Sequence, residues 1–141
     1  MTIVKDTPAT VIPTLHYEDA PAAIEWLCGT FGFVRHAVYP GENGTIAHAE
    51  LTLGNGMIML ASASEKEFGK YQKTPRGLGG TTQSAYIIVP IPDALHERAV
   101  KAGAEIVMPL SDRPYGGREF SCRDPQGHLW TFGTYDPWKK G

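Results

Sequence analysis

The sequence predicts an α+β fold of two tandem βαβββ modules, and three observations support this. A β-rich segment, a helical pattern and three further β-rich segments follow one another twice along the chain. Short glycine turns such as GENG and GNG lie between β-rich segments, where hairpins need them. A polar, glycine-rich stretch, residues 62–82, separates the two copies. The copies cover about residues 10–61 and 83–135, so we interpret residues 1–141 as one domain with an internal duplication.

The first module begins with a β-rich segment in which Pro13 favours an edge strand or a bulge. The helix that follows has Asp19 as its expected N-cap and Pro21 in its first turn. Either Gly29 or Gly32 is expected to end this helix, because glycine readily adopts the left-handed conformation of a helix C-terminus. The predicted strands of this module are 9–17, 33–40, 45–53 and 57–62, and the predicted helix is 18–33.

The second module repeats this order after the stretch 62–82, which we predict to be a long flexible connector. Its helix has Asp93 near the start and Gly103 as the expected stop. The predicted strands are 84–90, 105–110, 118–124 and 128–135, and the predicted helix is 93–104.

Composition excludes several classes of function. Hydrophobic residues make up 42% of the 141 residues, which is enough for a core, and the formal net charge is −2 with no basic run. Binding to nucleic acid or to an acidic membrane surface is therefore not expected. The N-terminus has no signal-peptide pattern, and no apolar run approaches membrane length. Cys28 and Cys122 fall outside any zinc spacing, so we expect a soluble cytoplasmic protein with free thiols.

Three stretches carry a resemblance to a known family: EDAPAAIEWLCGTFGF, AHAELTLGNGMIML and REFSCRDPQGHLWTFGTY. In this order, within a duplicated βαβββ unit, they resemble the vicinal oxygen chelate superfamily. That superfamily includes glyoxalase I, extradiol dioxygenases, and fosfomycin- and bleomycin-resistance proteins. The last two stretches look most like its PhnB-like, glyoxalase-like subgroup. The resemblance covers about residues 10–135 and implies an open, curved, barrel-like mixed sheet, with helices outside and a ligand on the concave face.

The resemblance also implies where the superfamily's metal ligands would lie. The four positions correspond to Ile12, Leu60, Ser84 and Thr131, with Glu50 as an alternative fourth ligand in place of Leu60. Hydrocarbon side chains and neutral hydroxyls do not hold a divalent transition metal in the way that imidazole and carboxylate groups do. The prediction is therefore a protein with no metal and no cofactor.

A displaced metal site remains an alternative. Strand alternation places Thr14 and His16 on the face of Ile12, and it places His48 on the face of Glu50. A trio of His16, His48 and Glu50 would supply suitable ligands, although polar residues lining a wet groove are the more ordinary interpretation. By the same alternation, His128 faces away from the side of Thr131 and is interpreted as a turn or surface residue.

The loop SDRPYGGREF adds two candidate contacts. Tyr115 can stack on a planar ligand and Arg118 can pair with an anionic group, although a hairpin loop with solvated charges is an equal interpretation. The first hypothesis is a homodimeric, metal-free protein that binds a small, partly aromatic or apolar molecule, with Tyr86 also contacting the ligand. The competing hypotheses are a metal-dependent lyase, isomerase or dioxygenase that uses displaced ligands, and a metal-free enzyme that uses His16 or Glu50.

Overall fold

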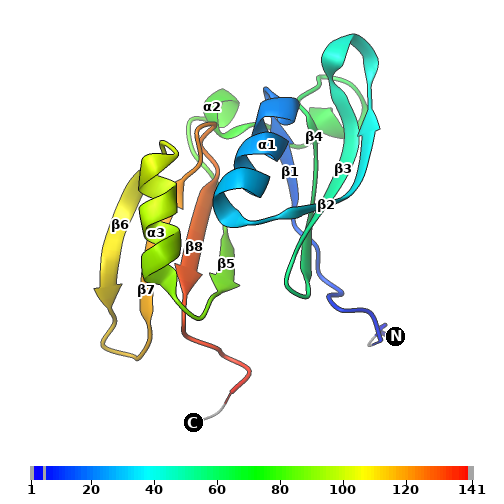
Figure 1. Ribbon diagram of the computed structural model, residues 1–141. Helices are drawn as coiled ribbons and strands as arrows, with labels where there is room; N and C mark the ends of the chain where they lie inside the picture. Colours follow the sequence, from blue (N-terminus) through cyan, green and yellow to red (C-terminus); the bar gives the residue numbers. More distant parts are fainter. Residues whose placement is uncertain (1, 5, 140–141) are drawn as a thin grey trace. The chain divides into compact units, whose positions relative to one another are not determined.

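The computed structural model describes residues 2–4 and 6–139, and the chain divides into two compact units, Met1–Gly77 and Leu78–Gly141. Each unit holds one βαβββ module whose four strands form an open mixed sheet (Figure 1). The first module contains β1 (Thr14–Tyr17), α1 (Ala20–Phe31), β2 (Val34–Pro40), the short helical turn η1 (Glu42–Gly44), β3 (Ile46–Leu53) and β4 (Gly56–Ser62). Two short helical turns follow, η2 (Glu67–Lys70) and α2 (Pro75–Leu78). The second module contains β5 (Ala85–Ile88), α3 (Pro92–Lys101), β6 (Glu105–Asp112), β7 (Arg118–Arg123) and β8 (Leu129–Gly133).

The two sheets have the same topology, which confirms the α+β fold and the repeated element order. The strand orders are β1-β4-β3-β2 and β5-β8-β7-β6. In each sheet the first strand lies at an edge and runs parallel to the last, while the remaining neighbours are antiparallel. Each module forms an open four-stranded sheet of its own rather than a closed barrel.

Helix α1 begins after the expected N-cap Asp19 and ends before Gly32, one of the two glycines expected to end it. The carboxylate of Asp19 accepts a hydrogen bond from the backbone N–H of Ala22 at 3.1 Å, and Pro21 occupies the first turn. The helix passes through Gly29 and ends before Gly32, which has a φ of 86°. Its apolar side packs on β1 and β4. No helix among residues 2–4 and 6–139 is long and apolar enough to cross a membrane.

Alternation along the strands gives each sheet one face that packs on the long helix of its own module, α1 or α3. The opposite face, which that helix does not contact, is called the helix-free face below. In the second unit, the ring of Phe120 on β7 meets His96 of α3 edge-on, with the ring centroids 5.0 Å apart. Phe120 and its neighbours on that face, Cys122, Trp130 and Phe132, are buried. In the first unit, the corresponding face carries Ala49, Leu51, Ile58 and Leu60, all buried.

The structure differs from the expected elements at several ends. Strand β1 starts after Pro13, so Ile12 lies outside it, and Ser84 precedes β5 by one residue. The stretch 62–82 contains the whole of η2 and α2, where a long flexible connector was expected. Its Gln72 also contacts β1, with the side-chain amide donating to the backbone carbonyl of Thr14 at 2.7 Å. This bond satisfies a carbonyl group of an edge strand.

Candidate functional site

The helix-free face of the second sheet brings together side chains from β5, β7 and β8. Tyr86 is opposite Thr131 in the register of β5 and β8, and Thr131 is opposite Ser121 of β7. The hydroxyl groups of Ser121 and Thr131 are hydrogen-bonded to each other at 2.6 Å. One step along β8, Gly133 is opposite Glu119. Alternation puts these residues on the side of the sheet away from Phe120 and α3.

Tyr86 and Glu119 converge above Gly133. A Cβ atom built on Gly133 would lie 2.6 Å from the hydroxyl oxygen of Tyr86 and 3.0 Å from Cβ of Glu119. The ring of Tyr86 therefore crosses β8 at the one point where the strand has no side chain. The Tyr86 hydroxyl donates a hydrogen bond to the backbone carbonyl of Tyr135 at 2.7 Å, which holds the segment after β8 in place.

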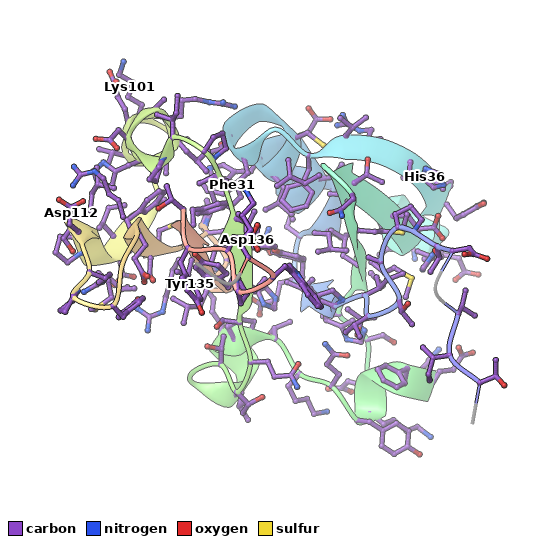
Figure 2. All side chains as sticks on the ribbon, turned by 90° about the horizontal axis from the view of Figure 1, so that it is seen from below. Phe31, His36, Lys101, Asp112, Tyr135 and Asp136 are labelled. Carbon is purple, nitrogen blue, oxygen red and sulfur yellow. The ribbon has the colours of Figure 1, made fainter. Side chains whose placement is uncertain are left out.

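Two further tyrosines complete this cluster. Tyr115 donates a hydrogen bond from its hydroxyl to Oε1 of Glu119, and its ring meets that of Tyr135 edge-on at a centroid distance of 6.1 Å. Figure 2 shows Tyr135 on the segment that follows β8. Tyr86, Tyr115 and Tyr135 are all exposed. We call these three residues together with Glu119 the tyrosine–glutamate cluster.

The electrostatics of the cluster keep the hydroxyl groups of Tyr86 and Tyr115 protonated. Burial is the largest cause that raises the pKa of Tyr86, and the charge of Glu119 raises it further. The hydrogen bond to Glu119 is the main cause that raises the pKa of Tyr115. Both groups therefore act as hydrogen-bond donors at neutral pH, and neither is poised as a base.

Arg113 lies beside the cluster but is incompletely paired. Its Nε is buried, makes no hydrogen bond, and lies 3.7 Å from Oε2 of Glu119. This distance is too long for a hydrogen bond, although the two opposite charges still attract each other. Oε2 of Glu119 accepts no hydrogen bond from the part of the chain that the structure describes.

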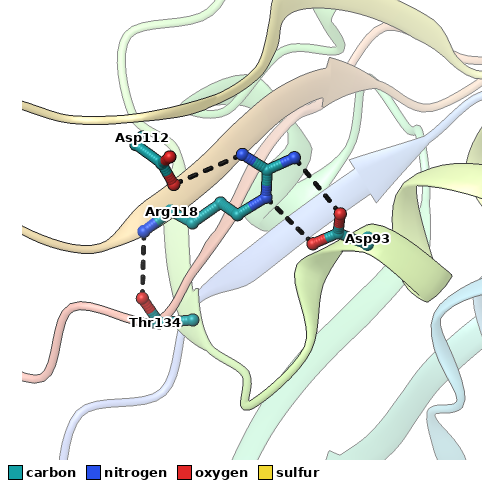
Figure 3. A network of polar contacts seen from close by, with 4 residues as sticks. All are labelled: Asp93, Asp112, Arg118 and Thr134. Carbon is teal, nitrogen blue, oxygen red and sulfur yellow. Dashed lines mark hydrogen bonds and ion pairs between the residues drawn. The ribbon is translucent and has the colours of Figure 1, made fainter.

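Arg118, a candidate for binding an anionic ligand, is engaged elsewhere (Figure 3). Its guanidinium group donates to both carboxylate oxygens of Asp93, at 3.0 and 3.2 Å, and to Asp112 at 3.3 Å. Its backbone N–H donates to the hydroxyl of Thr134 at 3.0 Å. The hydrogen bond with Asp93 is the main cause that raises the pKa of Arg118. The charge of Arg118 thus ties β7 to α3 and to the end of β6, and two carboxylates already balance it.

The helix-free face of the first sheet carries a second polar group around Glu50. Nε2 of His48 lies 2.9 Å from Oε2 of Glu50, as strand alternation along β3 led us to expect. The third side chain near Glu50 is His36 of β2, whose Nε2 lies 3.9 Å from Oε1, and not His16. The ring of Tyr39 stacks on His48 with a centroid distance of 6.0 Å.

His16 has a different environment at the edge of the same sheet. Its Nδ1 lies 3.3 Å from the backbone carbonyl of Gln72, and its ring meets Phe68 edge-on. The hydroxyl of the neighbouring face residue, Thr14, donates to the side-chain oxygen of Gln72 at 3.4 Å. The segment after β4 thus contacts Thr14 and buries His16, and the described residues do not bring His16, His48 and Glu50 together as a metal-binding trio.

Leu60 does not share the face of Glu50. It is opposite Ala49 and Leu15 in the strand register and is 2% exposed, so it belongs to the core under α1. The residue opposite Glu50 is Met59. The symmetry that equated Leu60 with Thr131 therefore fails by one residue, and a shift of one residue in a strand reverses the face.

The residues present do not fit the metal site that the resemblance implies. Of the four equivalent positions, Ile12 and Leu60 are hydrocarbons, while Ser84 and Thr131 offer only neutral hydroxyls. Among residues 2–4 and 6–139, no group of three or more His, Cys, Asp or Glu side chains is arranged to hold a metal ion. Glu50, the alternative to Leu60, does carry a side chain that binds metals, and Nε2 of His48 lies 2.9 Å from its carboxylate.

Sequence reasoning did not select four residues in or beside the tyrosine–glutamate cluster: Arg113, Glu119, Gly133 and Tyr135. Alternation from Thr131 identifies Gly133 as a face residue, but only the strand register shows that Glu119 lies opposite it. Tyr135 lies beyond β8, where the period of two no longer applies, so no pattern marked it.

Comparison with known proteins agrees with this architecture. A family model described as the Glyoxalase/Bleomycin resistance protein/Dioxygenase superfamily matches residues 12–132. An uncharacterised protein of Mycobacterium bovis is 35% identical over 121 residues, which cover 86% of this chain and 80% of that protein. The crystal structure of TioX from Micromonospora sp. ML1 has a TM-score of 0.64 and 35% identity, covering 87% of this chain and 95% of that one. The crystal structure of a bleomycin-binding protein from bleomycin-producing Streptomyces verticillus, complexed with copper(II)-bleomycin, has a TM-score of 0.63 and 26% identity. The match covers 95% of this chain and 100% of that chain.

Proposed function

Since the chain belongs to the glyoxalase/bleomycin resistance protein/dioxygenase superfamily, we propose that it binds a small organic molecule without holding a metal ion of its own. The ligand lies on the helix-free face of the second sheet, against the tyrosine–glutamate cluster. The single observation that carries this proposal is the convergence of Tyr86 and Glu119 above Gly133. It gathers exposed aromatic rings and one hydrogen-bond acceptor on the face of the sheet opposite α3.

Aromatic rings are suited to this role because they offer a large contact area at a low cost in side-chain entropy. Tyr86 and Tyr115 are further restrained by their hydrogen bonds to Tyr135 and Glu119, so their rings lose little freedom when a ligand arrives. The similarity to the Streptomyces verticillus protein, whose structure contains copper(II)-bleomycin, supports binding of an organic molecule rather than its chemical conversion.

A titration experiment tests the proposal. Isothermal titration of the full chain against a panel of glycopeptide and aromatic antibiotics is expected to give saturable binding to at least one member. Tyr86→Ala is expected to weaken that binding about tenfold or more, because it removes one aromatic wall. The matched control is Tyr71→Ala, which removes an exposed tyrosine outside the cluster and is expected to leave the affinity unchanged.

Metal analysis separates this proposal from the metal-dependent alternative. Protein purified without chelator is expected to contain much less than one equivalent of Ni, Zn, Mn or Fe. One equivalent per chain, lost in Glu50→Gln, would contradict the metal-free proposal and assign a metal to the group around Glu50.

We further propose that the protein is a cytoplasmic homodimer. Modules of this superfamily often pair across chains, and the two free cysteines, Cys28 and Cys122, suit a reducing compartment. Sedimentation velocity over a range of concentrations tests the oligomeric state, and fractionation of the source cells tests the compartment.

A further inference from the structure

The ligand class can be inferred from what the tyrosine–glutamate cluster leaves available. Tyr86 and Tyr115 already use their hydroxyl hydrogens in bonds to Tyr135 and Glu119. What these two residues still offer is mainly the faces of their rings. Ring faces select planar aromatic groups, which stack on them or meet them edge-on.

Glu119 supplies the polar part of the recognition. Oε1 is occupied by the hydroxyl of Tyr115, whereas Oε2 accepts no hydrogen bond from any residue in 2–4 and 6–139. The side chain is mostly enclosed, with 14% of its surface exposed, and Tyr86 lies beside it above Gly133. A partly enclosed carboxylate oxygen without a donor is a strong acceptor, so an N–H or O–H group of a ligand at this position would gain a charge-assisted hydrogen bond.

The balance of charge decides between a neutral donor and a cation. The guanidinium group of Arg113 lies 3.7 Å from Oε2 and offsets the charge of Glu119. A cationic ligand would meet repulsion from Arg113 that cancels much of its attraction to Glu119. An anionic ligand would face the carboxylate and find the hydroxyl hydrogens of Tyr86 and Tyr115 already committed. A neutral donor avoids both costs.

From this arrangement we infer that the cluster recognises a neutral, planar aromatic group that carries an N–H or O–H donor, such as a cyclic aromatic amide or a phenol. The donor bonds to Oε2 of Glu119 while the ring contacts Tyr86 and Tyr115. This inference rests on the proposed function and specifies the ligand class of the same site.

Four small probes that differ in one property each test the inference. The probes are 2-quinolone, N-methyl-2-quinolone, the 1-methylquinolinium cation and naphthalene-2-carboxylate. Each is titrated into the full ¹⁵N-labelled chain, and chemical shifts give both the affinity and the residues affected. We expect 2-quinolone to bind about tenfold or more tightly than its N-methyl derivative, since only the former donates a hydrogen bond to a charged acceptor. The cation and the anion are expected to bind more weakly than 2-quinolone.

Glu119→Gln keeps the size of the side chain and removes its charge. It is expected to reduce the discrimination between the two quinolones to about threefold or less, because the charge-assisted bond is lost. A purely steric role of position 119 would leave the discrimination unchanged. The matched control is Glu105→Gln, which makes the same change at an exposed glutamate of β6 paired with Arg123.

Several outcomes would overturn the inference. The first is equal affinity for 2-quinolone and its N-methyl derivative. The second is a higher affinity for the cation or the anion than for 2-quinolone. The third is a set of chemical-shift changes confined to residues of the first unit. If no quinolone binds but a member of the antibiotic panel does, the inference is wrong and the proposed function stands. If neither the probes nor the panel bind, the proposed function fails as well.

Discussion

The hydroxyl oxygen of Tyr86 lies only 2.6 Å from the point where a side chain at position 133 would begin. Gly133→Ala is therefore expected to displace the Tyr86 ring and break its hydrogen bond to Tyr135. We predict a loss of about 1–3 kcal/mol in the free energy of unfolding, as in other cases of overpacking. Ligand affinity is expected to fall about tenfold, because the ring is part of the binding face. Urea denaturation and titration calorimetry measure the two effects.

The double variant that combines Gly133→Ala with Tyr86→Phe provides the control for this prediction. Phenylalanine lacks the oxygen atom that makes the closest contact, so Gly133→Ala should cost less in that background. The ring carbon Cε1 would still lie 3.1 Å from the added Cβ atom, which makes the relief partial. We expect a coupling free energy of about 0.5 kcal/mol or more between the two positions. Strictly additive effects would show that the alanine side chain is accommodated in another way.

The turn before β8 is held together by Asp124, which is 4% exposed. One oxygen of its carboxylate accepts from the backbone N–H groups of Gln126 and His128, at 3.0 and 3.1 Å. The other accepts from the indole N–H of Trp130 at 3.0 Å. Asp124→Ala is predicted to lower the free energy of unfolding by about 2–4 kcal/mol, because three buried or half-buried donors lose their acceptor. Chemical denaturation checks this value.

Asp136→Ala is the matched control for Asp124→Ala. Asp136 also accepts from a backbone N–H, that of Trp138 at 2.9 Å, but it does so in an exposed segment. Its loss should cost less than about 0.5 kcal/mol. Similar costs at the two positions would mean that the buried network around Asp124 contributes little.

Cys122 introduces a dependence of stability on alkaline pH. Burial raises the pKa of its thiol from 9.0 to about 12, with a smaller contribution from the charge of Asp124. Well below pH 9 the thiol is protonated in both the folded and the unfolded state and does not affect stability. Between pH 9 and 12 the unfolded chain alone releases the proton, so the free energy of unfolding falls as the pH rises. From pH 8 to pH 10 this group should account for a decrease of about 1 kcal/mol.

The Cys122→Ala variant isolates that contribution, since other groups also titrate above pH 9. Its free energy of unfolding is expected to be lower than that of the wild type at pH 8, because the thiol fills space in the core. Its decrease between pH 8 and pH 10 should nevertheless be smaller by about 1 kcal/mol. Parallel pH profiles would show that Cys122 ionises with an ordinary pKa in the folded state.

Arg118 is predicted to act on the fold and not on the ligand. Arg118→Ala removes the paired hydrogen bonds to Asp93 and the contact with Asp112, so the melting temperature should fall by a few degrees. Ligand affinity should change less than about twofold, because the guanidinium group already has two carboxylate partners. A loss of affinity of about tenfold or more, measured by calorimetry, would instead place Arg118 in contact with the ligand.

Local chemistry allowed much of the fold to be predicted. The cap at Asp19, the αL residue Gly32 and the period-two patterns specified α1 and the strands, because each signal lies within a few neighbouring residues. Alternation within one strand also placed His48 on the face of Glu50, where the two side chains meet.

The sites were harder to predict because they depend on register between strands. Register decided that Met59, and not Leu60, lies opposite Glu50, and that Glu119 lies opposite Gly133. The position of His36 near Glu50 depends on irregular pairing of β2 with β3, which includes a register shift just after Arg35. Neither effect can be read from one strand alone.

The hydrogen bonds of Asp124 show that the turn before β8 has a structural role. Its carboxylate joins the turn to the next strand, and it does so whether or not the neighbouring residues hold a metal. Replacing Asp124 with asparagine or alanine would therefore change the stability of the hairpin formed by β7 and β8. A sequence search that relies on this turn will therefore find proteins that share the fold. It will not separate the enzymes among them from the proteins that only bind a ligand.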